Sequence, residues 1–160
     1  MKSKLAIAAL LVVIALGYAF TRGYSPFTSQ SVQTCEKAIQ ERLADPSSFQ
    51  RIGVEESRRS ITFDEFFTDR FRAVSEPTRK AMIEAARVAP IQYVALIDYQ
   101  AHDSIGAIIR ERATCTYYSL DGSDAPTRTS WVKIDGEYNV DWVARQPNAA
   151  ALHQRLLKNL

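Results

Sequence analysis

Apolar and polar residues alternate along residues 91–118, and this pattern predicts two β-strands joined by a short polar loop. Successive side chains of a strand point to opposite sides of a sheet. One face of residues 92–100 therefore carries Tyr93, Ala95, Ile97 and Tyr99. Residues 102–106 supply His, Asp, Ser and Gly, which are typical of a tight turn. The two strands are expected to form an antiparallel hairpin.

The return strand separates a mostly apolar face from a polar one. The apolar set includes Ile109, Ala113, Cys115 and Tyr117, so Cys115 is expected to point into the core. Glu111 is the exception on this face, and we expect it near the open hairpin end or at a bulge. The polar face consists of Arg110, Arg112, Thr114, Thr116 and Tyr118. We expect it to be either a contact surface for a partner or an ordinary solvated face.

A helical period of three and four residues precedes the hairpin. Val32, Cys35, Ile39 and Leu43 lie on one stripe of an amphipathic helix over residues 31–44. The helix should end at Asp45, because Pro46 cannot continue the hydrogen-bond ladder. Cys35 therefore faces the core.

The segment between this helix and the hairpin predicts one strand and two further helices. Residues 51–57 could form the strand. Residues 60–74 carry four phenylalanines at helical spacing, which favours core packing, with an exposed aromatic groove for a partner as the alternative. Ser75 starts a second helix that runs to about Val88, before Pro90.

After the hairpin the pattern predicts two more strands and a closing helix. Residues 127–134 read as a strand, and residues 137–140 as its partner across the Asp135-Gly136 turn, since a type I′ turn needs positive φ at both positions. Asn148 is suited to cap the closing helix. The expected fold is one α+β domain over residues 31–160, with helices packed on an antiparallel sheet of about four strands.

The chain resembles a group of small bacterial envelope proteins with an N-terminal apolar segment, an "LxDPxSF" helix end and a "DYxAxxSxGxxxR…CxY" hairpin. The matching residues are Cys35, Leu43, Asp45, Pro46, Ser48, Phe49, Asp98, Tyr99, Ala101, Ser104, Gly106, Arg110, Cys115 and Tyr117. The sequence departs from this pattern at His102-Asp103, where Gln-Asn is expected, and at Ile108, where Pro is expected. The resemblance implies location and fold, and it brings no catalytic residues.

The N-terminus has the pattern of an export signal. Lys2 and Lys4 precede an uncharged apolar run over residues 5–20. This run would span roughly 24 Å as a helix, short of a hydrocarbon core of about 30 Å, which favours a cleaved signal peptide. Tyr18 and Phe20 instead suit an uncleaved anchor held at the interface. Either alternative places the domain outside the inner membrane, after a polar tether at residues 21–30.

Charge does not indicate a nucleic-acid partner. Removing Lys2 and Lys4 from the 20 basic side chains leaves 18, equal to the 18 acidic ones. A neutral balance lacks the basic footprint of nucleic-acid binding. The expected partners are the membrane, through residues 5–20 if they are not cleaved, and another envelope protein.

The two cysteines carry the clearest chemistry. Cys35 and Cys115 lie on the predicted buried faces of two different elements, and an exported domain folds in an oxidising compartment. We therefore expect a Cys35–Cys115 disulfide; two buried free thiols or an intermolecular bridge are the alternatives. A redox role for the two cysteines is less favoured, because they lack the Cys-x-x-Cys spacing of redox-active pairs.

No pattern points to a catalytic centre. His102-Asp103-Ser104 contains the residue types of a hydrolase triad, but contiguous residues cannot easily place the imidazole between hydroxyl and carboxylate, so a turn is preferred. Ser130 and Lys133 match an S-x-x-K spacing that needs a helix, whereas the pattern here predicts a strand. The two histidines lack a zinc or iron spacing. No metal or cofactor is expected.

The sequence thus favours a non-enzymatic binding or accessory module of the cell envelope. An enzyme of unidentified class and a purely structural membrane-anchored domain are the alternatives. A concave pocket with convergent titratable groups would favour the enzyme, and a flat exposed apolar or aromatic patch would favour binding.

Overall fold

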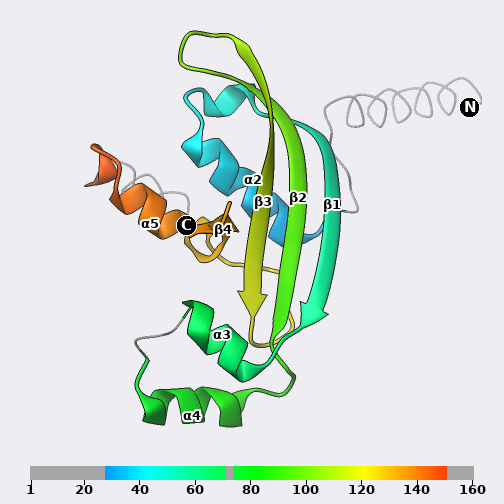
Figure 1. Cartoon of the computed structure of the whole chain (residues 1–160), viewed down its shortest axis with the longest axis vertical. Coiled ribbons are helices and arrows are strands. Elements are labelled where there is room, and N and C mark those ends of the chain that lie inside the picture. Colours follow the sequence, from blue (N-terminus) through cyan, green and yellow to red (C-terminus); the bar gives the residue numbers. More distant parts are fainter. Residues whose placement is uncertain (1–27, 71–73, 151–160) are drawn as a thin grey trace, which may run out of the picture.

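A five-stranded antiparallel sheet organises the part of the chain, residues 28–70 and 74–150, that the computed structural model describes. The strand order is β1-β2-β3-β4-β5, so each strand pairs with the next one along the chain (Figure 1). The strands are β1 (Gln50–Ser60), β2 (Ile91–His102), β3 (Ile108–Ser119), β4 (Lys133–Ile134) and β5 (Glu137–Tyr138). The helices are α2 (Gln30–Arg42), α3 (Phe63–Arg70), α4 (Glu76–Ala85) and α5 (Asn139–Ala144), with short 3₁₀ turns η1 (Pro46–Ser48) and η2 (Thr129–Trp131). The predicted α+β class is confirmed, with five strands where about four were expected.

The predicted hairpin is the centre of the sheet. β2 and β3 pair without interruption from Ile91 opposite Ser119 to His102 opposite Ile108. The Asp103 carboxylate accepts the backbone N–H groups of Ile105 and Ala107 at 2.9 and 2.8 Å, which closes the connecting loop. Residues 102–106 therefore form the expected turn.

Glu111 lies in this regular ladder, so the expectation of a bulge at this residue is wrong. Glu111 is opposite Tyr99, whose hydroxyl donates to Glu111 Oε2 at 2.7 Å. The Tyr99 ring is buried, and burial together with this hydrogen bond raises the pKa of its hydroxyl. Glu111 is exposed and accepts this hydrogen bond, so no break in the strand is needed to place its charge.

The main core lies between α2 and one face of the long strands. The helix begins after Ser29, whose side-chain oxygen accepts the Val32 N–H, an N-cap that satisfies an otherwise free donor. The buried cluster is made by Val32, Cys35, Ala38, Ile39, Ala95, Ile97, Tyr99, Ala101, Ala113, Cys115, Tyr117, Val132 and Ile134. Both predicted periodicities, of α2 and of the hairpin, are confirmed by this cluster.

A Cys35–Cys115 disulfide joins α2 to β3 through this core. The two Cα atoms are 6.0 Å apart, within the usual range for a disulfide, and the chain contains no free cysteine. The predicted intramolecular bond is therefore confirmed, and the two alternatives, free thiols and an intermolecular bridge, do not apply to this structure.

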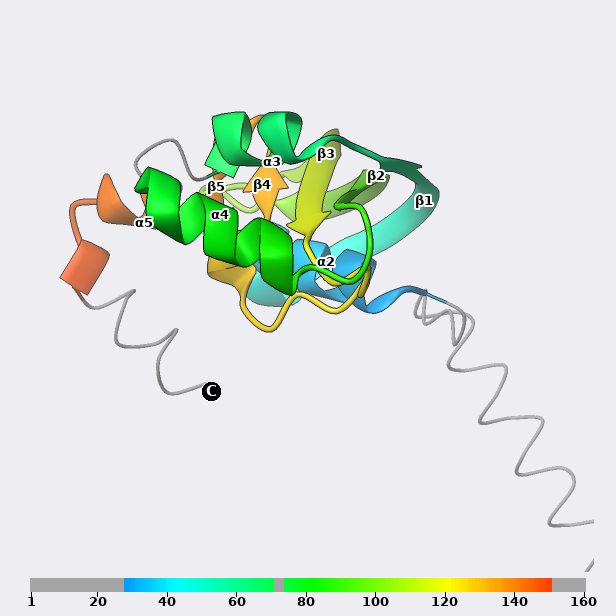
Figure 2. The same cartoon turned by 90° about the horizontal axis from the view of Figure 1, so that it is seen from below.

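A second, smaller core lies on the opposite face of the sheet, where α3 packs (Figure 2). It contains Ile61, Phe66 and Phe67, and Tyr118 packs against it. Because neighbouring residues of a strand face opposite sides, Tyr117 joins the main core and Tyr118 the second one. The prediction that the phenylalanine-rich helix packs into a core is correct.

The predicted third and fourth strands are mostly wrong. Of residues 127–134, only Lys133 and Ile134 are in a strand, and η2 precedes them. The Asp135-Gly136 turn is confirmed, with φ of 54° and 84°. The following strand stops at Tyr138, because Asn139 begins α5.

Three further boundaries differ from the expectation or cannot be compared with it. α4 ends at Ala85, three residues before the expected end at Val88. The predicted apolar segment at residues 5–20 and residues 151–160 of the predicted closing helix lie outside the described residues. Within residues 28–70 and 74–150, no helix has the length and apolar character needed to cross a membrane.

Candidate contact surface

The sheet face that points away from α2 contains the predicted contact residues. We call this face, on β2 and β3, the open face. Its members are Arg110, Arg112, Thr114, Thr116 and Tyr118 of β3, and the β2 residues opposite them, Gln100, Asp98, Leu96, Val94 and Gln92. The regular pairing of the hairpin places all ten on one side of the sheet.

One end of the open face is charged. Arg112 donates from Nε and Nη2 to the two carboxylate oxygens of Asp98, at 2.6 and 2.8 Å, in a bidentate ion pair. This hydrogen bonding holds the pKa of Asp98 below its ordinary value and raises that of Arg112. Both side chains are solvent-accessible, so the pair orders the surface more than it stabilises the fold. Arg110 is exposed next to it.

The middle of the open face is of mixed polarity. Leu96 lies opposite Thr114 and Val94 opposite Thr116, and all four side chains are partly exposed. The Thr114 N–H donates to Asp135 Oδ1 at 2.8 Å, and the Asp135 N–H donates back to the Thr114 carbonyl at 2.8 Å. The β4–β5 turn thus holds β3 in place beside a short apolar strip.

Tyr118 is less accessible to a partner than the other four predicted contact residues. It is half-buried against Phe66 and Phe67, and its hydroxyl accepts Gln92 Nε2 at 3.2 Å. Burial raises the pKa of the Tyr118 hydroxyl. The accessible part of the predicted contact surface therefore runs from Arg110 to Thr116.

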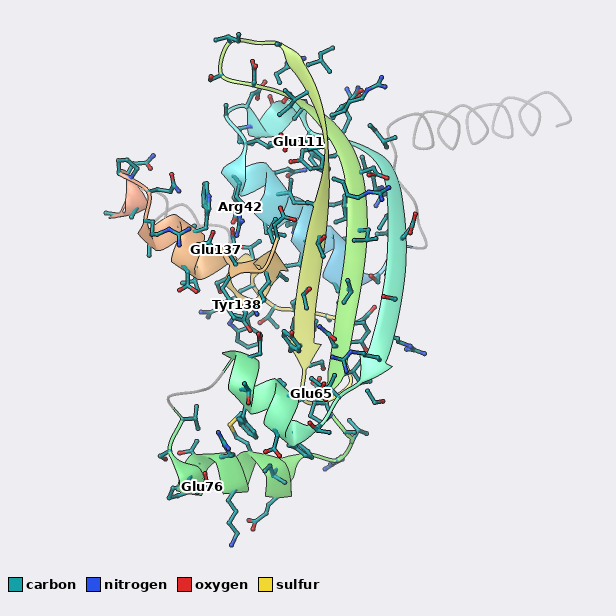
Figure 3. The ribbon with its side chains drawn as sticks, viewed as in Figure 1. Arg42, Glu65, Glu76, Glu111, Glu137 and Tyr138 are labelled. Atoms are coloured by element: carbon teal, nitrogen blue, oxygen red, sulfur yellow. A yellow bond between two sulfur atoms is a disulfide. The ribbon has the colours of Figure 1, made fainter. Side chains whose placement is uncertain are left out.

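Lys133 lies at the end of the open face that is nearest to α3. Lys133 forms an ion pair with Asp69 of α3, and its ammonium lies 5.7 Å from the centre of the Tyr118 ring and 4.9 Å from that of Tyr138. The Tyr138 hydroxyl donates to the same aspartate at 2.8 Å, and Figure 3 shows Tyr138 just above α3. These contacts join α3 to β4 and β5. Local sequence patterns could not predict these contacts, because Asp69 is separated from Lys133 by 64 positions and from Tyr138 by 69.

A second polar cluster joins the end of α2 to α5. Asn139, fully buried, donates to Glu41 Oε2 at 2.6 Å and accepts Arg42 Nε at 3.0 Å. Figure 3 shows Arg42 beside Glu137, whose backbone carbonyl accepts Arg42 Nη2 at 3.2 Å. Burial raises the pKa of Glu41 and lowers that of Arg42. Because these polar groups are hydrogen-bonded to one another, we interpret the cluster as a structural contact that holds α5 against the end of α2.

The two arrangements that resembled catalytic motifs do not form in this fold. Asp103 caps the hairpin loop, and His102 Nδ1 points toward Asp45, with Oδ2 at 3.9 Å. The hydrolase order of His, Asp and Ser is therefore absent from this loop. Ser130 lies on η2, while the ammonium of Lys133 is paired with Asp69.

An open groove of about 470 Å³ lies beside the β1 edge. Its lining consists of Ser29, Glu56, Ser57, Arg58, Tyr93, Gly122, Ser123 and Asp124. Over the described ranges, no group of three or more His, Cys, Asp or Glu side chains is placed to hold a metal ion. Searches of protein-family models, curated proteins and solved structures find no match to this chain.

Proposed function

We propose that this chain is a non-enzymatic binding module of the cell envelope, and that a protein partner contacts the open face between Arg110 and Thr116. The observation that carries this proposal is the difference between the two sides of the central hairpin. One side is buried under α2 through the disulfide-linked core. The other presents partly exposed Val94 and Leu96 with charged and hydroxyl groups around them.

The chemistry of this strip suits a protein partner better than a small ligand. Small-molecule sites are concave and bury most of their ligand, whereas the strip lies on two adjacent strands and the groove of about 470 Å³ is lined by other residues. Protein interfaces combine an apolar centre with a polar rim and are enriched in arginine. Val94 and Leu96 supply the apolar centre, and Arg110 and Arg112 the rim.

The proposed location is the outer side of the inner membrane. Support comes from the basic and then apolar N-terminal pattern and from the Cys35–Cys115 bond, since structural disulfides persist in oxidising compartments. A reporter that is active only outside the cytoplasm, fused after Leu160, should be active. Activity of a cytoplasmic reporter alone at the same position would contradict export.

Site-specific photo-crosslinking in intact cells tests the contact surface. A photoreactive residue at Thr114 should yield one discrete adduct, while the same residue at Ala81, exposed on α4, should yield none. Leu96→Lys, which adds a charge to a partly exposed position opposite Thr114, should abolish the adduct without unfolding the domain. Equal adducts at Thr114 and Ala81, or an adduct that persists in Leu96→Lys, would contradict the proposal.

A further inference from the structure

The outer edge of β1 is the longest unpaired strand edge in the described part of the chain. β1 ends the strand order, and Figure 1 shows it at the outer side of the sheet. Its residues from Glu55 to Ser60 are all exposed. An edge of this kind presents a row of N–H and C=O groups that can pair with another strand.

The phase of the β1–β2 hydrogen bonds shows which backbone groups are free. The Ile61 N–H donates to the Pro90 carbonyl at 2.9 Å, directly beyond the Ser60–Ile91 pair. In an antiparallel ladder, hydrogen-bonded positions alternate. Odd-numbered residues of this segment therefore bond to β2, and Glu56 and Arg58 direct their N–H and C=O groups outward.

The charges along this edge are antisymmetric about Ser57, because the sequence reads Glu-Glu-Ser-Arg-Arg over residues 55–59. In an antiparallel pair of identical strands with Ser57 opposite itself, Glu55 faces Arg59 of the second copy and Glu56 faces Arg58. The first pair lies on the side of the sheet that carries the open face, and the second on the α2 side. Opposite charges then meet on both faces of the junction.

We propose that two copies of this chain associate through antiparallel pairing of their β1 edges about Ser57. The dimer has a two-fold axis perpendicular to the sheet, as expected for a self-complementary contact. Moving the centre to Glu56 or Arg58 would place identical charges opposite each other, which is unfavourable. The charge pattern therefore selects one register among those that keep the two sheet faces aligned.

Charged residues on an edge strand often prevent pairing, but two observations argue against that role here. Glu55, Glu56 and Arg58 form no ion pair within the described residues, so their charges are available to a second copy. Arg59 pairs with Glu65 at 3.1 Å, but both side chains are about half exposed and such a pair is weak. The bulge between Arg51 and Gly53 lies outside the symmetric segment and limits pairing to a short stretch.

Disulfide trapping of the full chain in cells tests this register. Ser57 bonds to β2, so across the interface Ser57 and its copy form a non-hydrogen-bonded pair with Cα atoms about 4.5 Å apart, suitable for a disulfide. Ser57→Cys should give a reducible dimer band. Ser60→Cys is the matched control, because two Ser60 positions would lie roughly 20 Å apart along the strands. Equal trapping of both variants would overturn the proposal.

Charge exchange separates specific pairing from random collision. In the Ser57→Cys background, Arg58→Glu opposes two glutamates on each side of the axis and should reduce trapping about tenfold. Adding Glu56→Arg restores opposite charges and should restore trapping. Trapping that is unchanged by Arg58→Glu, or that stays low in the exchanged variant, would refute charge-directed pairing. Neither substitution touches the open face, so failure here leaves the proposed partner surface intact.

Discussion

Removing the Cys35–Cys115 bond should cost the domain about 3–5 kcal/mol of unfolding free energy. The bond joins residues separated by 80 positions, and the chain-entropy relation gives about 4.5 kcal/mol for a loop of this length. Residual structure in the unfolded chain lowers this figure. The two side chains are 2 % and 0 % exposed, so truncation to alanine also leaves unfilled space in the core and raises the cost.

Urea denaturation of Cys35→Ala, Cys115→Ala and the double variant measures this cost, with the fluorescence of Trp131 and Trp142 as the signal. Each single variant should lose the full amount, and the double variant should be only slightly worse, because the second change removes a bond that is already absent. A reductant should lower the stability of the natural chain toward that of the double variant. It should leave the double variant unchanged.

Additive losses in the double variant would refute this reasoning, because they would mean that each cysteine contributes by packing alone. A natural chain whose stability is insensitive to reductant under unfolding conditions would lead to the same conclusion. In either case the bond between α2 and β3 would not be what limits the entropy of the unfolded chain.

Four further substitutions test the two cores and the open face. Ile97→Ala should cost about 2–5 kcal/mol because Ile97 is fully buried, whereas Thr116→Ala should cost less than about 1 kcal/mol; equal losses in urea would contradict the assignment of faces. Phe67→Ala should cost about 3–5 kcal/mol if α3 packs as described, and an unchanged denaturation midpoint would argue against that packing. Arg112 holds the pKa of Asp98 below its ordinary 3.8, so the stability it supplies is present above that value and lost as pH falls through the lower folded value. Asp98→Asn should therefore show a shallower loss of stability in acid denaturation below about pH 4, and parallel acid curves would exclude this contribution.

Elements whose pattern is local could be predicted from the sequence. The stripe through Val32 and Ile39 and the alternation through Ala113 and Cys115 each need only a few neighbouring residues to define the buried face. The helical period and the strand alternation independently place Cys35 and Cys115 in the same core, and this placement predicts the disulfide. The Asp135-Gly136 turn was also predictable, because its backbone conformation depends on the two residues themselves.

The segment after the hairpin failed for the opposite reason. Asn139 begins α5 although residues 137–140 read as a strand, and its side chain is held by Glu41 and Arg42, almost 100 positions earlier. Such contacts override weak local preferences. The third predicted strand likewise contains η2, where Thr129 donates to Glu41 Oε1 at 3.1 Å. Sequence periodicity carries no information about partners at this separation.

The candidate contact surface shows the same limit in another form. Alternation along β3 identified the correct side of the sheet for Arg112 and Tyr118 alike, but it could not tell that α3 covers only the second. That distinction requires knowledge of where Phe66 and Phe67 pack. The antisymmetric charges of β1 are likewise visible in the sequence. They indicate a pairing surface only once β1 is known to be an edge strand.

The proposed dimer and the proposed partner surface are geometrically compatible. A two-fold axis perpendicular to the sheet keeps the same face of both copies on the same side, so Glu55 and Arg59 pair at the junction of two aligned open faces. The two strips around Leu96 then lie on one continuous sheet, separated by the paired β1 strands of the two copies. A partner that contacts both strips binds the second one intramolecularly, and its apparent affinity rises without any new type of contact. Arg58→Glu should therefore weaken adduct formation at Thr114 when the partner spans both copies. It should leave adduct formation unchanged when each open face binds a partner on its own.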